Sequence, residues 1–178
     1  MNICIYGASS NDIEKMYIQA GEDLGRFMAQ SGHTLIFGGG QTGLMGAVVR
    51  GLSEYGGKSI GIAPRFFDIP GVLFADCTEF IFTETMRERK DLMEKKADAF
   101  IMTPGGIGTM EEFFEIYTLK QLKQHNKPIG ILNTGGYYND LIALLENTAA
   151  KGFMAHECLD LFVVSEDPEI LLQLLITS

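Results

Sequence analysis

Short apolar runs alternate with longer segments of helical periodicity along the whole chain, and this alternation limits the possible folds more than any other feature. The apolar runs of strand length cover residues 2–7, 34–39, 58–63, 79–82, 99–102, 128–132 and 161–164. The helical segments cover residues 12–32, 43–56, 85–97, 108–124, 137–152 and 167–176. Unbroken apolar strands separated by helices indicate a parallel sheet that is buried on both faces. The sequence therefore predicts an α/β fold, a doubly wound, Rossmann-like parallel sheet with helices on both faces.

Length and charge narrow the class of protein further. A chain of 178 residues with 46% hydrophobic residues suits one well-filled core, so we expect residues 1–178 to form a single domain. Lys and Arg number 14 against 23 Asp and Glu, which gives a formal net charge of -9. Such a chain has no electrostatic basis for binding a nucleic-acid polymer.

The cysteines and the first residues indicate where the protein resides. Cys4, Cys77 and Cys158 are odd in number and far apart, which favours buried thiols over disulfides or a metal site. The first apolar run is too short for a signal peptide, and no apolar stretch approaches the length of a membrane span. We therefore expect a cytoplasmic protein with no membrane contact.

Ligands of open parallel sheets bind beside the carboxyl ends of the strands, at the point where the strand order reverses. Three predicted strands are followed there by loops rich in glycine or serine. These loops are "GASS" at 7–10, "GGGQTG" at 38–43 and "TPGGIGT" at 103–109, and each leads into a predicted helix.

The loop at 38–43 has three interpretations. Gly38, Gly40 and Gly43 match G-x-G-x-x-G, which suggests a dinucleotide site. Such a site also needs an acidic residue at the end of the next strand, and "KSIGIAP" (58–64) provides none. The glycines can instead permit a tight turn and close helix packing, or they can belong to a mononucleotide or phosphate-sugar site.

The loop at 103–109 is suited to an anion. Gly105, Gly106 and Gly108 expose backbone N–H groups, Thr109 adds a hydroxyl, and the helix that follows contributes the positive end of its dipole. No lysine follows the last glycine, so this is not a Walker A loop. Glu112 has two competing roles: it can close a capping box with Thr109, or it can lie near C1' of a bound ribose 5-phosphate.

The charged segment 83–98 contains a second possible capping box, formed by Thr85 and Glu88. Arg87, Arg89 and Lys90 fall in the first turns of the predicted helix, where cations oppose the helix dipole. We therefore expect at least one of them to have an anionic partner. A guanidinium directed at a phosphate is one such arrangement.

Four motifs resemble those of one known family. "PGGIGTMEE" (104–112) matches P-G-G-x-G-T-x-x-E, and "MRERK" (86–90) resembles the M-H-x-R-K motif that precedes it. "GGGQTGLMGAV" (38–48) and "IYGASS" (5–10) are similar to G-G-G-x-x-G-L-M-G and C-G-S-S. Together they resemble the LOG (Lonely Guy) family of cytokinin riboside 5'-monophosphate phosphoribohydrolases, formerly labelled lysine decarboxylase-like.

The resemblance implies a cytoplasmic, homodimeric hydrolase of cytokinin biosynthesis that cleaves the N-glycosidic bond of N6-modified AMP. It needs no cofactor and no metal, and it makes Arg89 and Glu112 the catalytic residues. The substrate-binding positions that we expect are Gly7, Ser9, Gly39, Gly40, Met86, Lys90, Pro104, Gly105, Gly106, Ile107, Gly108, Thr109, Glu111 and Thr118.

The same chemistry suits the residues themselves. Cleavage of the glycosidic bond passes through an oxocarbenium-like ribose, which the Glu112 carboxylate could stabilise while it positions or deprotonates water. Arg89 could bind the phosphate or orient that carboxylate. Whether Glu112 acts as a base or as a nucleophile stays open, as does the base that is released.

Two features depart from the family's pattern, and two other functions compete. Arg87 stands where the family has histidine, and the segment 63–80 differs from the usual substrate-side loop. A lysine decarboxylase needs a lysine that binds pyridoxal phosphate, and Lys90, Lys95 and Lys96 lie in no such motif. The stronger alternative is a non-catalytic nucleotide sensor or carrier, which would not need both Arg89 and Glu112.

Overall fold

The computed structural model describes residues 1–178, and its centre is a seven-stranded parallel sheet. The strands are β1 (Asn2–Tyr6), β2 (Thr34–Phe37), β3 (Lys58–Pro64), β4 (Glu79–Thr83), β5 (Ala99–Met102), β6 (Ile129–Leu132) and β7 (Val163–Ser165). Their order is β4-β3-β2-β1-β5-β6-β7, and every neighbouring pair is parallel. The predicted sheet is thereby confirmed.

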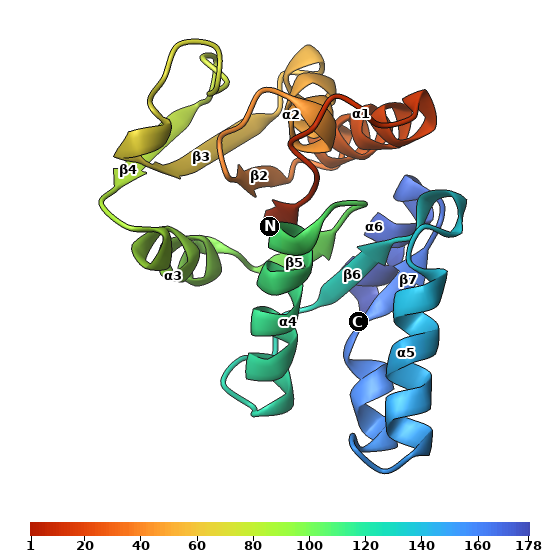
Figure 1. The fold of residues 1–178 in the computed structure, drawn as a ribbon. Coiled ribbons are helices and arrows are strands. Elements are labelled where there is room, and N and C mark those ends of the chain that lie inside the picture. The colour runs from red at the N-terminus through yellow and green to blue at the C-terminus, as the bar shows by residue number, and fades with distance from the viewer.

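Six α-helices cover the sheet on both faces (Figure 1). They are α1 (Lys15–Gln30), α2 (Gly43–Glu54), α3 (Met86–Lys96), α4 (Ile107–Gln121), α5 (Asn139–Ala150) and α6 (Pro168–Thr177). Helices α1, α2 and α6 enclose one hydrophobic core, and α3, α4 and α5 enclose the other. Strand β1 supplies both cores, because Ile3 and Ile5 point to one face and Cys4 and Tyr6 to the other.

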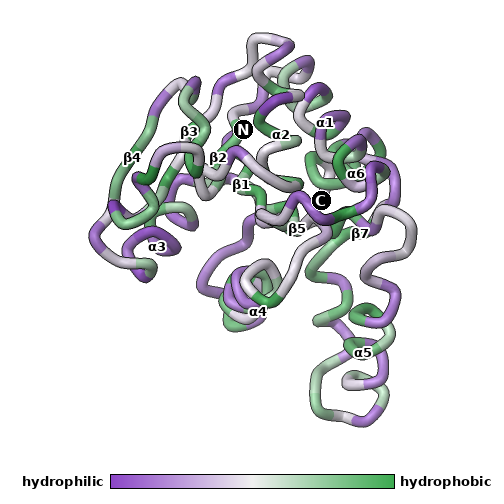
Figure 2. The backbone as a smooth tube through the Cα atoms, turned by 45° about the horizontal axis from the view of Figure 1, so that its top comes forward, coloured by the Kyte–Doolittle hydropathy of each residue, from purple (hydrophilic) through white to green (hydrophobic).

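Helix α3 differs from the others in its sequence, "MRERKDLMEKK", and is largely hydrophilic along its length (Figure 2). Only Arg89 and Met93 of this helix are buried. A helix with so few apolar contacts needs other interactions to fix its position. Ion pairs of Arg89 and Lys90 with residues of α4 provide them.

The strand order reverses at β1, which lies between β2 and β5. Tyr6 at the end of β1 pairs with Met102 at the end of β5, so the loops after these two strands start side by side. The loop after β2 starts beside them, because β2 is the other neighbour of β1. The three loops selected from the sequence therefore meet at one edge of the sheet.

The last strand differs from its prediction. Residues 161–164 were expected to be extended, whereas the strand covers Val163–Ser165. A 3-10 helix occupies His156–Leu161, and the chain becomes extended only after it. Apolar residues alone do not separate these two conformations.

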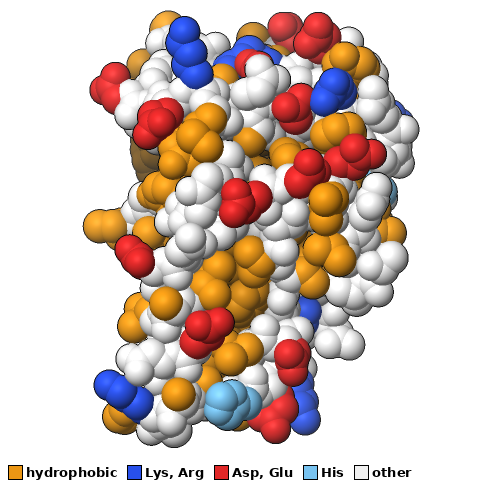
Figure 3. Space-filling model, turned by 90° about the vertical axis from the view of Figure 1, so that its right-hand side faces the viewer, with side chains coloured by type: hydrophobic (Ala, Val, Ile, Leu, Met, Phe, Trp, Pro, Cys, Tyr) orange, Lys and Arg blue, Asp and Glu red, His pale blue; other side chains and the backbone are white.

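Some large hydrophobic side chains remain on the surface. Leu144 on α5, Phe153 after α5 and Ile170 on α6 are 57%, 84% and 51% exposed. Hydrophobic side chains gather in patches between acidic ones on the side of the molecule where α5 and α6 lie (Figure 3). None of the helices has both the length and the apolar character that crossing a bilayer requires.

Candidate active site

A cavity of about 390 Å³ opens at the carboxyl edge of the sheet, where the three loops meet. Nine of the residues expected from the sequence line it: Gly7, Ser9, Gly40, Met86, Arg89, Gly106, Gly108, Thr109 and Glu112. Seven others complete the lining: Ala8, Gly38, Thr42, Met45, Phe67, Val72 and Leu73. The other seven expected residues do not line the cavity: Gly39, Lys90, Pro104, Gly105, Ile107, Glu111 and Thr118.

Helix α2 cannot offer its N-terminus to a ligand, because the loop after β1 already caps it. The Ala8 carbonyl accepts hydrogen bonds from the Leu44 and Met45 amides at 2.9 and 3.2 Å. The Gly43 amide donates to Asn11 Oδ1 at 2.8 Å. The dinucleotide interpretation of the loop at 38–43 requires this helix end to bind pyrophosphate, so the capping argues against it.

Helix α4, in contrast, begins with free donors. Its N-cap is Gly106, which has no side chain to accept a hydrogen bond. The amides of Ile107, Gly108 and Thr109 find no acceptor within the protein. Because Gly106, Gly108 and Thr109 line the cavity, the positive end of this helix faces the ligand space.

Of the two competing roles of Glu112, the capping box with Thr109 is wrong. The helix begins at Ile107, so Thr109 already lies inside the first turn. Its side chain is buried against Gly105, where an added Cβ would lie only 2.2 Å from Thr109 Oγ1. Glu112 is therefore not needed as a cap, and its carboxylate is engaged elsewhere.

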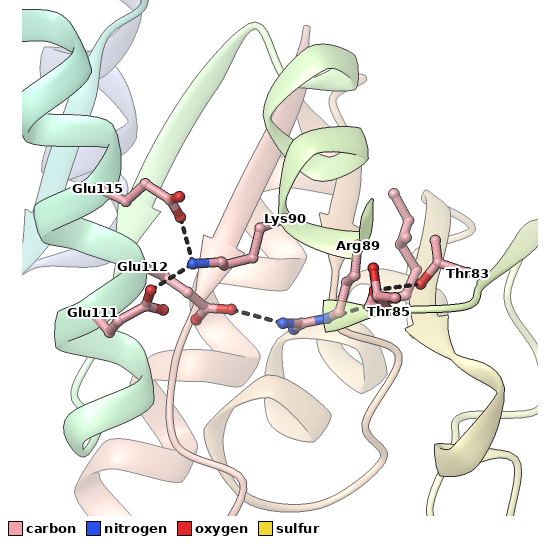
Figure 4. Close-up of polar contacts among 8 residues, drawn as sticks. Thr83, Thr85, Arg89, Lys90, Glu111, Glu112 and Glu115 are labelled. Carbon is pink, nitrogen blue, oxygen red and sulfur yellow. Dashed lines mark hydrogen bonds and ion pairs between the residues drawn. The ribbon is translucent and has the colours of Figure 1, made fainter. Parts of the chain in front are cut away.

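Glu112 pairs with Arg89, which reaches it from helix α3 (Figure 4). Arg89 Nη1 donates to Glu112 Oε1 at 2.9 Å, and the two side chains are only 9% and 13% exposed. Arg89 Nε donates to the Ile62 carbonyl at the end of β3, at 3.2 Å. The guanidinium is thus held from both sides, and the predicted anionic partner of this cation cluster is confirmed.

Two opposing effects act on the carboxyl group of Glu112. Burial raises its pKa, and the charge and hydrogen bond of Arg89 lower it. Burial is the larger effect, so the pKa of Glu112 is raised above its usual value. A carboxyl group with a perturbed pKa in a cavity is a typical feature of catalytic sites.

Helix α3 presents Arg89 through a fixed first turn. The capping box of Thr85 and Glu88 is confirmed, with each side chain bonded to the other's backbone amide. The Arg89 amide in turn donates to the Thr85 carbonyl at 3.1 Å. Gly38 leaves room for the guanidinium, because a Cβ there would lie 2.3 Å from Arg89 Nη2.

Lys90 ties helix α3 to helix α4. Its ammonium group bonds to the carboxylates of Glu111 and Glu115 (Figure 4). It is thus turned toward α4 in this structure, and its expected contact with nucleotide stays a prediction. Arg87 is exposed and forms no ion pair, and Thr118 is exposed on α4 beyond Glu115.

The segment 65–74 forms an apolar wall of the cavity on the β2 side of β1, whereas α4 follows β5 on the other side. Phe67, Val72 and Leu73 line the cavity there together with Met45 and Met86. Backbone hydrogen bonds fix this segment: the Gln41 amide donates to the Val72 carbonyl, and the Phe74 amide to the Gly39 carbonyl. The individual wall residues were missed, although the sequence marked the segment as divergent and rich in Phe.

A second hollow, of about 550 Å³, lies at the other end of α4 and includes Lys120, His125 and Cys158. It is larger, but no free helix N-terminus opens into it and none of the glycine-rich loops reaches it. The chemistry of the smaller cavity therefore identifies the candidate site.

The cavity does not suit pyridoxal phosphate, because no lysine lines it and a Schiff base has no residue on which to form. No three His, Cys, Asp or Glu side chains are arranged to hold a metal ion.

Comparisons with known proteins identify the family of the chain. The family model described as "Possible lysine decarboxylase" matches residues 45–175. The chain is 37% identical to the probable cytokinin riboside 5'-monophosphate phosphoribohydrolase LOGL1 of Oryza sativa subsp. japonica, over 90% of this chain and 72% of the relative. It is 39% identical to the cytokinin riboside 5'-monophosphate phosphoribohydrolase of Rhodococcoides fascians, over 86% of this chain and 78% of the relative.

Solved structures support the fold alone. The molybdenum cofactor carrier protein of Chlamydomonas reinhardtii superposes with a TM-score of 0.73 at 21% identity, covering 99% of this chain and 98% of that one. The molybdenum cofactor binding protein of Rippkaea orientalis gives 0.71 at 21% identity, covering 99% and 94%. The family model, the relatives and the sequence motifs agree on one assignment: the chain belongs to the LOG family of cytokinin riboside 5'-monophosphate phosphoribohydrolases.

Proposed function

We propose that this protein hydrolyses the N-glycosidic bond of N6-modified adenosine 5'-monophosphate and releases the free base and ribose 5-phosphate. One observation carries the proposal: a free helix N-terminus and the buried Arg89–Glu112 pair face the same cavity. Glu112 follows Gly108 by about one helical turn, about 6 Å along the axis. A phosphate bound at the amides of α4 would therefore bring the ribose beside this carboxylate.

The apolar wall suits the other end of the substrate. With the phosphate at α4, the base would extend toward Phe67, Val72 and Leu73, which offer no charged group. An apolar substituent at N6 of adenine would be buried there, and burial of apolar surface favours binding. This end of the cavity therefore supports an N6-modified base over plain adenine.

The reaction needs charge stabilisation at C1' and a water molecule. As the bond between C1' and the base breaks, the ribose acquires positive charge, which the Glu112 carboxylate stabilises. The oxygen of water then forms a bond to C1', and its proton is transferred to the departing base. Arg89 keeps the carboxylate oriented and ionised through its hydrogen bond at 2.9 Å.

The family assignment brings further proposals. Arg89 and Glu112 are the catalytic residues, and the expected positions that line the cavity with them bind the substrate. Residues 1–178 form one nucleotide-binding domain, which acts as a homodimer in the cytoplasm. The apolar side chains that α4 leaves on the surface, such as Phe114, support the homodimer.

The test is to incubate the purified protein with AMP and with isopentenyladenosine 5'-monophosphate and to follow free base and ribose 5-phosphate by chromatography. Glu112→Gln and Arg89→Ala should each lower the rate at least about a hundredfold, the usual effect of losing a transition-state electrostatic contact. Glu115→Gln is the matched control, because Glu115 lies on the same helix outside the cavity and leaves Lys90 bonded to Glu111.

Release of base by the wild type and the control, but not by the two variants, is the expected result. Binding of nucleotide without any release would instead identify a sensor or carrier. Release that persists in Glu112→Gln would remove Glu112 from the mechanism.

A further inference from the structure

Three consecutive carbonyl groups after β5 each accept a hydrogen bond from another part of the chain. The Thr103 carbonyl accepts from the Tyr138 hydroxyl at 2.8 Å. The Pro104 carbonyl accepts from the Ala8 amide at 3.1 Å. The Gly105 carbonyl accepts from the Tyr137 hydroxyl at 2.9 Å. The turn between β5 and α4 is thus fixed by the hydrogen bonds that its carbonyl groups accept.

Holding a carbonyl also orients the next amide. In a trans peptide unit the oxygen and the following N–H lie in one plane and point in opposite directions, and every peptide bond of this chain is trans. Because the Tyr137 hydroxyl fixes the Gly105 carbonyl, the Gly106 N–H points away from Tyr137. Gly106 lines the cavity, and its amide has no acceptor within the protein.

Tyr137 itself lies outside the cavity and is 42% exposed, and two other rings pack against it. It follows the 3-10 turn Thr134–Gly136, in which Gly135 and Gly136 adopt positive φ of 60° and 72°. Its ring packs edge-on against Tyr17, with 5.7 Å between ring centroids, and against Tyr138, with 4.8 Å. The hydroxyl consequently has a defined position at the Gly105 carbonyl.

We propose that Tyr137 is a positioning residue that aims the Gly106 amide at the substrate phosphate, through the Gly105 carbonyl. This role rests on the proposed function, because it concerns the phosphate end of the same site. Tyr138 offers a natural contrast: the peptide unit that it holds continues into Pro104, whose nitrogen carries no hydrogen. Its hydroxyl therefore orients no donor.

The test compares Tyr137→Phe with Tyr138→Phe, each of which removes one hydroxyl and keeps the ring. Tyr137→Phe should raise KM for the nucleoside monophosphate about tenfold, the effect of weakening one hydrogen bond to a charged group. Its kcat should stay within about twofold, because Glu112 and Arg89 are untouched. The dissociation constant of ribose 5-phosphate, measured by calorimetry, should rise by the same factor as KM.

Tyr138→Phe should lower the melting temperature, because its hydroxyl is buried, while KM and the dissociation constant of ribose 5-phosphate stay at wild-type values. An unchanged dissociation constant in Tyr137→Phe would overturn the inference, and so would an equal increase in both variants. Calorimetry needs no turnover. If the wild type binds ribose 5-phosphate without hydrolysing any nucleotide, the proposed function fails, while weaker binding by Tyr137→Phe still supports the positioning role.

Discussion

Glu112 is the residue on which the chemistry depends, and two opposing effects act on its ionisation. Burial raises the pKa of its carboxyl group, and Arg89 lowers it. The proposed reaction requires the ionised form, because only a carboxylate stabilises positive charge on the ribose. Activity should therefore fall as the pH decreases through the pKa of Glu112.

Replacing Arg89 by methionine should move this acidic limb to higher pH. The guanidinium favours the ionised carboxylate, so its removal raises the pKa of Glu112 further and leaves a smaller ionised fraction at any given pH. The measurement is kcat/KM between about pH 4 and pH 8 for the wild type and Arg89→Met, since this profile reports groups of the free enzyme. An acidic limb at the same pH in both proteins would assign it to another group.

The sequence identified Arg89 and Glu112 separately, each from a motif, and it left open whether Arg89 binds the phosphate or orients the Glu112 carboxylate. They come from different helices, and their contact depends on how α3 and α4 pack across the ends of β3 and β5. The capping-box alternative at Thr109 fails for a local reason. The T-x-x-E pattern records spacing only, whereas the helix began two residues before the threonine, after a glycine.

Helix α3 is the element that carries Arg89, and it has few buried residues to hold it in place. Its first turn depends on Thr85, the N-cap residue. The Thr85 hydroxyl oxygen accepts a hydrogen bond from the Glu88 amide, and the Thr85 carbonyl accepts one from the Arg89 amide. Thr85→Ala should therefore lower the free energy of unfolding by about 1 kcal/mol, the usual effect of losing an N-cap. It should also lower kcat/KM severalfold, because the loosened turn no longer aims the guanidinium.

Thr148→Ala is the matched control for the cap, since the Thr148 hydroxyl bonds only to the Leu144 carbonyl within α5. Chemical denaturation and steady-state kinetics measure both variants. Thr85→Ala with wild-type stability and activity would show that α3 is positioned without its cap.

At the scale of elements, the sequence predicted the sheet well because its strands are uniformly apolar and the helices separate them. The sequence could not predict which connections between strands and helices form walls of the cavity. The segment 65–74 has no regular strand or helix beyond the short 3-10 turn Arg65–Phe67, and it is held by backbone bonds to Gly39 and Gln41. Such long-range bonds leave no periodic trace in a sequence.

The whole molecule is expected to be a homodimer, and α4 supplies a test. Phe114 is 37% exposed on this helix although Phe113 beside it is fully buried. If α4 contributes to the interface, the wild type should sediment at twice the chain mass of 19.6 kDa, and Phe114→Glu should sediment as a monomer. Leu174→Glu places the same charge on an exposed apolar site of α6 and should remain dimeric. Monomeric wild-type protein would contradict the expectation.

The two ends of the cavity are made by separate stretches of chain. The turn between β5 and α4 provides the end suited to phosphate, and residues 65–74 provide the apolar end about forty residues earlier in the sequence. Because the earlier stretch rests on Gly39 and Gln41 rather than on α4, mutations can accumulate in it without disturbing the hydrolytic groups. Natural divergence and laboratory selection can therefore change which base is accepted without changing the residues that act on the ribose.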